Sequence, residues 1–301
     1  MKWVVGVSIG SSKRDHKVEV DLLGERVVIE RRGTDGDLEK ARAMIEELDG
    51  RADAIGLGGL DLYIFAGGRR YTFRDSKKLA RAASKTPVVD GSGLKNTLER
   101  RVVRQLAEDQ ALGLKGKRVL LVVAVDRFGM AEELEALGCR MVYGDLIFAL
   151  GIPIPLTSLR SLARLARIVA PIATQLPFKI LYPTGDKQER STPRYSRYFE
   201  QADVIAGDFH YIKRYMPDRL DGKVIITNTL TADNVAQLKD RGVSCVVGTT
   251  PDMGGRSFGT NVMEAALVAV SGRRPEAMTP ADYNAILDEL GFRPRLERFR
   301  P

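Results

Sequence analysis

The sequence contains very few of the residues that bind zinc or cross-link small folds. Only two cysteines, Cys139 and Cys245, and two histidines, His16 and His210, occur among its 301 residues. Both cysteines lie in apolar, strand-like stretches without paired spacing, which is typical of buried thiols in a reducing compartment. We therefore expect neither a disulfide framework nor a bound metal.

Long apolar runs are also missing. The opening run, Trp3–Ile9, is too short for a signal peptide. The most apolar region, 146–182, is interrupted by Arg160, Arg164 and Arg167, so it does not reach the roughly 18 residues that a membrane-spanning helix needs. We therefore expect a cytoplasmic protein that does not cross a membrane.

A basic amphipathic helix is predicted inside that region, over residues 158–170. Such a helix can lie on a membrane surface, but it more often packs as a lid or a subunit contact, which is the interpretation that we prefer. A homodimer is therefore an assembly that the chain could form. The polar segment Tyr182–Lys187, further along, could cover a cleft.

Charges of one sign do not form a block, although basic residues are in excess. The chain has 47 lysines and arginines against 39 acidic residues, a formal net charge of +8, and 44% hydrophobic residues. These values are those of an ordinary folded protein. Because basic residues do not alternate with aromatic ones and no nucleic-acid motif is recognised, we expect a small-molecule partner rather than nucleic acid.

Short apolar strands alternate with helices, which predicts an α/β protein, and the length favours two domains. The segment 93–113 predicts one long helix packed between them, because Leu94, Leu98 and Val102 share a face. The unbroken apolar run 119–125 then predicts a strand buried on both faces of a parallel sheet.

Four parts follow from this pattern. We predict an N-terminal α/β substrate-type domain over 1–95, a hinge helix over 96–116, a Rossmann-like doubly wound parallel sheet over 117–256, and C-terminal helices over 257–301 that return to the first domain.

The turn after the first strand of the second domain is the predicted cofactor site. In a dinucleotide-binding fold a glycine-rich turn brings a pyrophosphate to backbone N–H groups at a helix start. Ala124 and Asp126 stand where the first two glycines would be, Gly129 stands in a fingerprint position, and Arg127 could bridge to the phosphates. Asp145, about twenty residues later, could accept a hydrogen bond from a ribose hydroxyl or cap the following helix.

Further polar residues end other strands or begin helices. Asn228 and Thr249 follow apolar strands, at the edge where α/β sheets bind ligands. Asp90 ends a strand before Gly-Ser-Gly, which suits either ligand binding or a helix cap. Lys95 lies in the first turn of the long helix and is either a proton-transfer group or a solvated residue. Asn261, in the segment 257–261, lies at a helix start, where anions and caps are both stabilised.

The order of these parts resembles the shikimate/quinate 5-dehydrogenase family. Asp90-Gly91-Ser92-Gly93 keeps the Asp-x-x-Gly part of the family's motif before the hinge helix, and Ser12 and His16 keep the spacing of its Ser-Pro-x-x-His segment, with Lys13 in place of proline.

The resemblance implies an oxidoreductase that transfers a hydride between NAD or NADP and a hydroxylated carboxylic acid. The proton of the substrate's hydroxyl group would be transferred by Asp90 together with Lys95 or Lys13, which we propose as substitutes for the family's lysine. The substrate would be bound by Ser11, Ser12, His16 and Asn261. The cofactor would be bound by Ala124, Asp126, Arg127, Gly129, Asp145, Asn228 and Thr249.

Two other functions remain open. The strand-turn-strand around Gly10-Ser11-Ser12-Lys13 resembles the first phosphate loop of the acetate and sugar kinase superfamily, which implies an ATP-dependent phosphotransferase. The same scaffold could also be a non-catalytic protein that binds a nucleotide or another ligand, because a fold does not determine a function.

Overall fold

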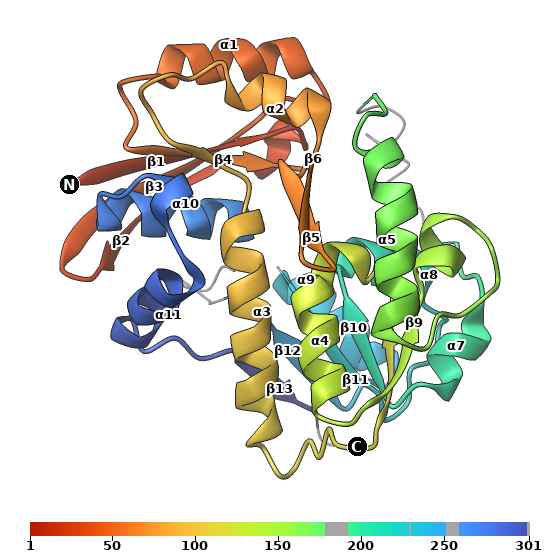
Figure 1. The fold of residues 1–301 in the computed structure, drawn as a ribbon. Coiled ribbons are helices and arrows are strands. Elements are labelled where there is room, and N and C mark those ends of the chain that lie inside the picture. Colours follow the sequence, from red (N-terminus) through yellow and green to blue (C-terminus); the bar gives the residue numbers. More distant parts are fainter. Residues whose placement is uncertain (178–191, 229, 251–258, 300–301) are drawn as a thin grey trace.

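The computed structural model describes residues 1–177, 192–228, 230–250 and 259–299. They form two α/β lobes on either side of a long helix, α3 (Ser92–Ala107). In Figure 1, the lobe that contains β1 lies above the N-terminal end of α3, and the other lobe lies beside the rest of this helix.

The first lobe is built on a five-stranded sheet in the order β2-β3-β1-β4-β7. Strands β2 and β3 form an antiparallel hairpin, whereas β3, β1, β4 and β7 run parallel. The elements of this lobe are β1 (Lys2–Ser8), a 3-10 turn η1 (Ser12–Arg14), β2 (His16–Leu22), β3 (Glu25–Gly33), α1 (Leu38–Leu48), β4 (Ala54–Gly58), β5 (Tyr63–Ala66), β6 (Arg69–Thr72), α2 (Arg74–Ala80) and β7 (Val88–Val89).

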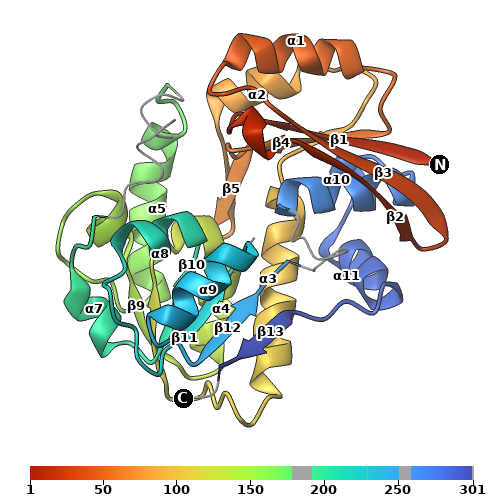
Figure 2. The ribbon, with the colours of Figure 1, turned by 180° about the vertical axis from the view of Figure 1, so that it is seen from behind.

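Alternation along β1 divides the core of this lobe between two faces. Val5 and Val7 pack with Ile45 of α1, whereas Val4 packs with Val262 of α10 (Thr260–Ser271). Figure 2 shows α1 on one side of the sheet and α10 on the other. The last long helices are therefore not an appendage, because α10 supplies one whole face of the first lobe.

The second lobe has a six-stranded sheet in the order β13-β12-β11-β10-β8-β9. All its strands are parallel except β13, which pairs antiparallel with β12 at the edge. Its strands are β8 (Arg118–Leu121), β9 (Arg140–Tyr143), β10 (Val204–Gly207), β11 (Val224–Thr227), β12 (Cys245–Gly248) and β13 (Arg295–Arg298).

Helices cover both faces of this sheet, as the unbroken apolar strand predicts. Leu121 packs into the core that contains α3, α4 and α5, whereas Leu120 packs against α7, α8 and α9. The bounds of the remaining elements are η2 (Val125–Arg127), α4 (Phe128–Ala136), a π turn η3 (Asp145–Ala149), α5 (Leu159–Ala173), α7 (Ser196–Gln201), α8 (Phe209–Tyr215), α9 (Ala232–Asp240), η5 (Pro275–Ala277) and α11 (Pro280–Glu289).

The α/β class and the two lobes with parallel strands are confirmed, but the Rossmann-like order is wrong. Counted from β8, the parallel strands lie in the order 2-1-3-4-5. The dinucleotide-binding Rossmann sheet has the order 3-2-1-4-5-6 instead. The sequence pattern cannot separate the two, because both consist of the same alternation of strands and helices.

The chain passes between the lobes three times. It leaves the first lobe through α3, returns from β12 to α10, and crosses back from α11 to β13. The hairpin β5–β6 reaches the second lobe as well, where β5 contacts η2 and α5. The junction between the lobes is therefore made of several chain segments that lie far apart in the sequence.

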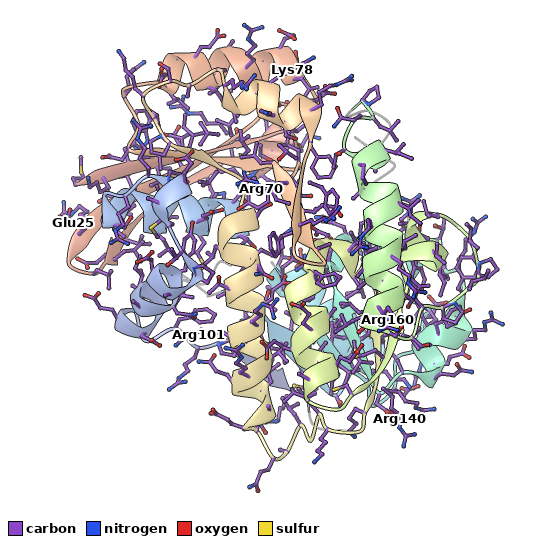
Figure 3. The ribbon with its side chains drawn as sticks, in the orientation of Figure 1. Glu25, Arg70, Lys78, Arg101, Arg140 and Arg160 are labelled. Carbon is purple, nitrogen blue, oxygen red and sulfur yellow. The ribbon has the colours of Figure 1, made fainter. Side chains whose placement is uncertain are left out.

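Basic side chains are spread over the outside of both lobes. Figure 3 shows Lys78 on α2, Arg140 at the start of β9 and Arg160 on α5, all of them exposed. Within the described ranges, the helices are too short or too polar to cross a membrane.

Candidate functional site

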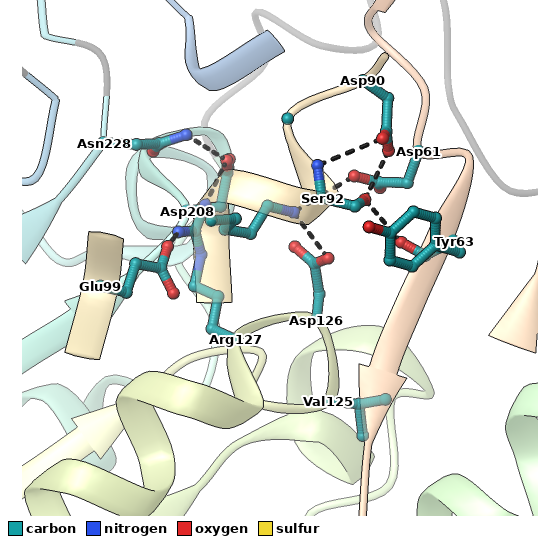
Figure 4. A network of polar contacts seen from close by, with 12 residues as sticks. Asp61, Tyr63, Asp90, Ser92, Glu99, Val125, Asp126, Arg127, Asp208 and Asn228 are labelled. Carbon is teal, nitrogen blue, oxygen red and sulfur yellow. Dashed lines mark hydrogen bonds and ion pairs between the residues drawn. The ribbon is translucent and has the colours of Figure 1, made fainter. Parts of the chain in front are cut away.

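A lysine on α3 connects the two lobes. Lys95 Nζ lies 3.2 Å from an oxygen of Asp61, in the loop after β4, and 2.8 Å from an oxygen of Asp126, in the turn after β8. Figure 4 shows these two acids, Asp61 above Asp126. Although burial lowers the pKa of Lys95, the carboxylates of Asp126 and Asp61 raise it above the ordinary value. The two carboxylates therefore favour the charged form of Lys95.

One turn further along α3, a buried ion pair lies beside this bridge. Arg127 of η2 pairs with Glu99 of α3, and its other terminal nitrogen lies 3.1 Å from Asp208, which precedes α8. Asn228 donates to the same Asp208 oxygen at 3.0 Å. Arg127 and Glu99 are only 3% and 2% exposed, so their charges are almost wholly removed from water.

A small cavity lies where β5, α3 and the turn η2 meet. Lys95, Glu99, Asp126 and Arg127 line it on the polar side, and the aromatic side chains of Tyr63, Phe65 and Phe128 line the rest. Among the described residues, three buried atoms of the lining side chains lack a hydrogen-bond partner, namely Asn96 Oδ1, Glu99 Oε2 and Arg127 Nε. Buried polar atoms are rarely left unpaired, so these atoms point to a bound partner.

Burial has the larger effect on the cavity's acidic groups. It raises the pKa of Glu99 to about 7, and the charges of Arg127 and Lys95 offset this only in part. For Asp208, burial is again the largest single effect and raises the pKa, but the charges of Arg127 and His210 and the hydrogen bonds from the His210 N–H and Asn228 together outweigh it, and the pKa falls to about 2. Two carboxylates that share one arginine therefore differ in protonation near neutral pH.

Asp90 begins the connection from the first lobe into α3. Its carboxylate accepts hydrogen bonds from the N–H groups of Leu62 at 2.6 Å and Ser92 at 3.1 Å, and from the Ser92 hydroxyl. Gly91 follows with φ of 97°, a left-handed conformation that favours glycine. The cap is thus one role of Asp90, and its buried position next to Asp61 raises its pKa.

A second buried carboxylate lies beside this cap. Glu264 of α10 accepts the Gly91 N–H at 2.7 Å and the Tyr283 hydroxyl at 2.8 Å. Burial, and then the proximity of Asp90, raise the pKa of Glu264. Two neighbouring buried acids therefore join β7, α3, α10 and α11 at the junction of the lobes.

Asp145 contradicts the predicted pyrophosphate site. Its carboxylate accepts hydrogen bonds from the N–H groups of Ala124 at 3.0 Å and Val125 at 2.9 Å, so the chain's own carboxylate occupies the donors that a phosphate would need. It is 4% exposed, and burial raises its pKa to about 6. Asp145 therefore closes the turn and does not bind a ribose.

Glycine is required at position 129 for a different reason from the predicted one. A Cβ at this position would clash with the Asn96 side chain and lie 2.9 Å from the Asn96 carbonyl oxygen. The glycine lets α4 approach α3 closely. The backbone approaches a neighbouring helix here, not a ligand.

The N-terminal candidates form a separate group at the edge of the first sheet. Ser12 N–H donates to Asp35 and Lys13 N–H to the Ser11 hydroxyl, so these donors of the proposed phosphate loop are engaged within the chain. The Lys13 side chain is exposed. His16 Nδ1 lies 3.0 Å from the Arg14 carbonyl oxygen.

The remaining candidates lie in three places. Asn261 donates to the Gly56 carbonyl oxygen at 3.4 Å, where α10 meets the first sheet. Thr249 is buried and donates its N–H to Thr227 at 2.8 Å. Asn228 is the one of the three that joins the cavity's network, through Asp208. The loop 182–187 and residues 257 and 258 lie outside the described residues.

Sequence reasoning missed Asp61, Glu99 and Glu264. Glu99 had a usable signal, because it lies four residues after Lys95 on the same helix face. Asp61 follows the glycine turn that ends β4, at the edge where ligands bind. Glu264 had no such signal in the sequence, because nothing marks a carboxylate in an apolar helix as a site residue until its buried partners are known.

The fold and this site define a two-lobed α/β protein with a polar cavity where its lobes meet. Two family models match the sequence: a domain of unknown function (DUF8754) over residues 93–299, and a domain of unknown function (DUF8753) over residues 3–90. The first covers most of the chain, and the chain belongs to the DUF8754 family. A search of curated proteins finds no match.

Solved structures similar to this chain include binding proteins of sugar transport systems. One is a substrate-binding protein of a sugar ABC transport system from Bordetella parapertussis, with 14% identity and a TM-score of 0.38 over 97% of this chain and 82% of that chain. Another is a glucose-galactose binding protein from Geobacillus stearothermophilus, with 10% identity and a TM-score of 0.39 over 99% and 97%. A third is an ABC transporter solute-binding protein from Burkholderia multivorans, with 13% identity and a TM-score of 0.39 over 92% and 96%.

These comparisons overturn the resemblance to the shikimate/quinate 5-dehydrogenase family. Neither family model names a dehydrogenase, and the similar structures are binding proteins of transport systems. The expected oxidoreductase activity, the NAD or NADP cofactor and the cytoplasmic location were therefore wrong. The physical reason why the cofactor prediction failed is the turn at Ala124, whose N–H groups already bind Asp145 and are not available to a pyrophosphate.

Proposed function

We propose that the chain is a non-catalytic binding protein for a small hydroxylated molecule, which it holds in the cavity between β5, α3 and η2. The observation that carries this proposal is the pair of unpartnered buried atoms, Glu99 Oε2 and Arg127 Nε, on residues that line the cavity. One atom accepts and the other donates. A hydroxyl group does both, so adjacent hydroxyls complement this pair.

The other walls suit the same class of molecule. Ligand sites combine apolar and aromatic surface with a few polar groups that fix orientation. Tyr63, Phe65 and Phe128 supply the aromatic surface, and Asp126 and Lys95 supply further polar atoms at the more exposed side. A polyol or monosaccharide presents C–H faces to the rings and hydroxyls to the charged groups.

Binding without a reaction agrees with the protonation of these groups. Lys95 and Arg127 keep raised pKa values through their carboxylate partners, so neither is a base near neutral pH. Both positive charges stay available as hydrogen-bond donors to a ligand. We expect the ligand to leave chemically unchanged.

Isothermal titration with glycerol, erythritol, ribose, arabinose, glucose and galactose tests the proposal. At least one should bind saturably and be recovered unaltered by NMR. Lys95→Met and Asp126→Asn should each weaken that ligand about tenfold, the equivalent of about 1.4 kcal/mol. Asp221→Asn is the matched control, because Asp221 is 58% exposed and pairs with Arg219 on the far surface. Absence of saturable binding, or binding that both cavity variants leave intact, would refute the proposal.

A further inference from the structure

The charges around the cavity are unbalanced. Its ion-pair network contains two cations and four carboxylates, namely Lys95 and Arg127 with Asp61, Glu99, Asp126 and Asp208. This excess of negative charge occurs in a chain whose formal net charge is +8. The site therefore attracts a ligand of the opposite sign to the one that the chain as a whole would attract.

Glu99 is the carboxylate with unused capacity. One of its oxygens pairs with Arg127, and the other is buried without a partner among the described residues. Figure 4 shows Glu99 beside Arg127. An ionised carboxylate at 2% exposure is costly unless it is paired and hydrogen-bonded, and N–H donors from a charged group give the strongest such bonds.

The charged groups that surround Glu99 are already committed to one another. Arg127 and Asp126 face it from η2, Lys95 lies one turn earlier on α3, and Asp208 lies beyond Arg127 at the start of α8. Lys95 is held by Asp61 and Asp126, and Arg127 is shared with Asp208. The positive charge at Glu99 is thus divided among several acids, which leaves room for another cation.

Resting on the function proposed above, we infer that the natural ligand carries an ammonium group next to its hydroxyls, and that Glu99 binds this ammonium through Oε2. The ligand class is then an amino alcohol or amino sugar rather than a neutral sugar or a hydroxy acid. The cation stabilises the ionised carboxylate, so its binding drives a proton off Glu99 at neutral pH. The affinity for such amines rises with pH as Glu99 ionises and falls again at the higher pH where the ligand's own ammonium loses its proton.

Matched ligand pairs test this inference by titration calorimetry at pH 7. Glycerol and 2-aminopropane-1,3-diol differ only in one hydroxyl exchanged for an amino group, and glucose and glucosamine differ in the same way. In at least one pair, we expect the amine to bind about ten times more tightly than the matched compound that carries a hydroxyl group. Equal or weaker binding of the amines, with saturable binding of the hydroxyl twins, would overturn the inference and leave the proposed function standing. If no member of the panel bound, both would fail.

The Glu99→Gln variant separates this carboxylate from the rest of the site. It should reduce the preference for the amine to within about twofold, whereas Asp218→Asn, at a position that is 94% exposed, should keep it. An undiminished preference in a folded Glu99→Gln protein would overturn the role of Glu99.

A measurement on the unaltered protein covers the case in which Glu99→Gln does not fold. Binding of 2-aminopropane-1,3-diol should show a heat that changes with the ionisation enthalpy of the buffer, because a proton is released. Glycerol should show no such change. A buffer-independent heat for the amine would contradict the inference.

Discussion

Asp145 illustrates how a single carboxylate decides between two functions of the same turn. Its two oxygens accept the N–H groups of Ala124 and Val125, the donors that the sequence offers to a phosphate. The residue type and spacing are those of a dinucleotide site, yet the side chain points at the turn itself. The direction of a side chain is set by packing around it, which one sequence does not contain.

Replacing this residue should therefore cost stability. Asp145→Ala leaves two buried N–H groups unpaired, and we expect the free energy of unfolding to fall by about 2–4 kcal/mol, since each buried unpaired donor costs about 1–3 kcal/mol and they partly rehydrate. Urea unfolding measures it. Asp221→Ala, which removes an exposed carboxylate, should stay within about 0.5 kcal/mol of the unaltered protein. Tight NAD binding gained by Asp145→Ala would instead mean that the turn retains a cofactor site.

Other site residues show which part of a site a sequence can supply. Asp126, Arg127 and Asn228 were predicted because they follow parallel strands, whereas Asp90 came from the family resemblance and Lys95 was proposed on chemistry as a substitute for that family's lysine. The structure pairs Lys95 with Asp126 and joins Arg127 and Asn228 through Asp208, and Asp90 lies near enough to Lys95 for their charges to interact. Their pairing was not predictable. Lys95 needs Asp61 and Asp126, which lie 34 and 31 residues away, and only the arrangement of the lobes brings them together.

At the scale of elements, α3 and α4 depend on one glycine for their close approach. Gly129 of α4 faces Asn96 of α3, and Arg100 and Arg104 of α3 pair with Glu132 and Glu133 on the next turn of α4. The pairing holds the two helices together along their exposed edge. The sequence pattern predicted both helices, but it placed Gly129 in a phosphate-binding turn. Glycine allows the backbone to approach a ligand and allows one helix to approach another, so the residue type alone does not separate the two roles.

Gly129→Ala tests which role is correct. The added methyl group must displace Asn96, and overpacking of this kind costs about 1–3 kcal/mol, reduced by the roughly 1 kcal/mol that alanine gains over glycine within a helix. We expect a net loss of about 1 kcal/mol in thermal or urea unfolding. Gly248→Ala is the control, because a Cβ there would make ordinary contacts, the nearest at 3.5 Å. A stabilised Gly129→Ala protein would contradict the close packing of α3 and α4.

The whole molecule is held together where the chain crosses between its lobes. The strand order and the packing of α10 on the first lobe depend on contacts across the whole molecule. Local periodicity predicted the strands and helices but not the order of the strands in the sheets. Asp90 and Glu264 lie at this junction, linked through the Gly91 N–H, with Tyr283 of α11 as a further donor. Gly91 and Glu264 are 173 residues apart in the sequence, so any change in the charge of the acids acts on the connection between the lobes.

The junction should make stability depend on pH. Burial holds the pKa values of Glu264 and Asp90 above those of the unfolded chain. The charge of Asp90 raises the pKa of Glu264 further, and the charge of Asp61 raises that of Asp90. The folded state therefore binds protons more tightly than the unfolded state. The stability that these groups contribute is fully present below the usual carboxyl pKa of about 4 and is lost as the pH rises toward neutrality.

Glu264→Gln isolates this effect in urea unfolding between pH 4.5 and 8. The variant removes one titrating acid and relieves Asp90 of a neighbouring charge, so its stability should fall less with rising pH than that of the unaltered protein. Tyr283→Phe is the matched control, because it removes a hydroxyl that donates to Glu264 but keeps both acids, and its profile should fall at least as steeply as the original. Parallel profiles for Glu264→Gln and the unaltered protein would mean that the buried pair does not set the pH dependence. In that case the charge on these acids would already be balanced in the folded state, and the junction between the lobes would be insensitive to pH.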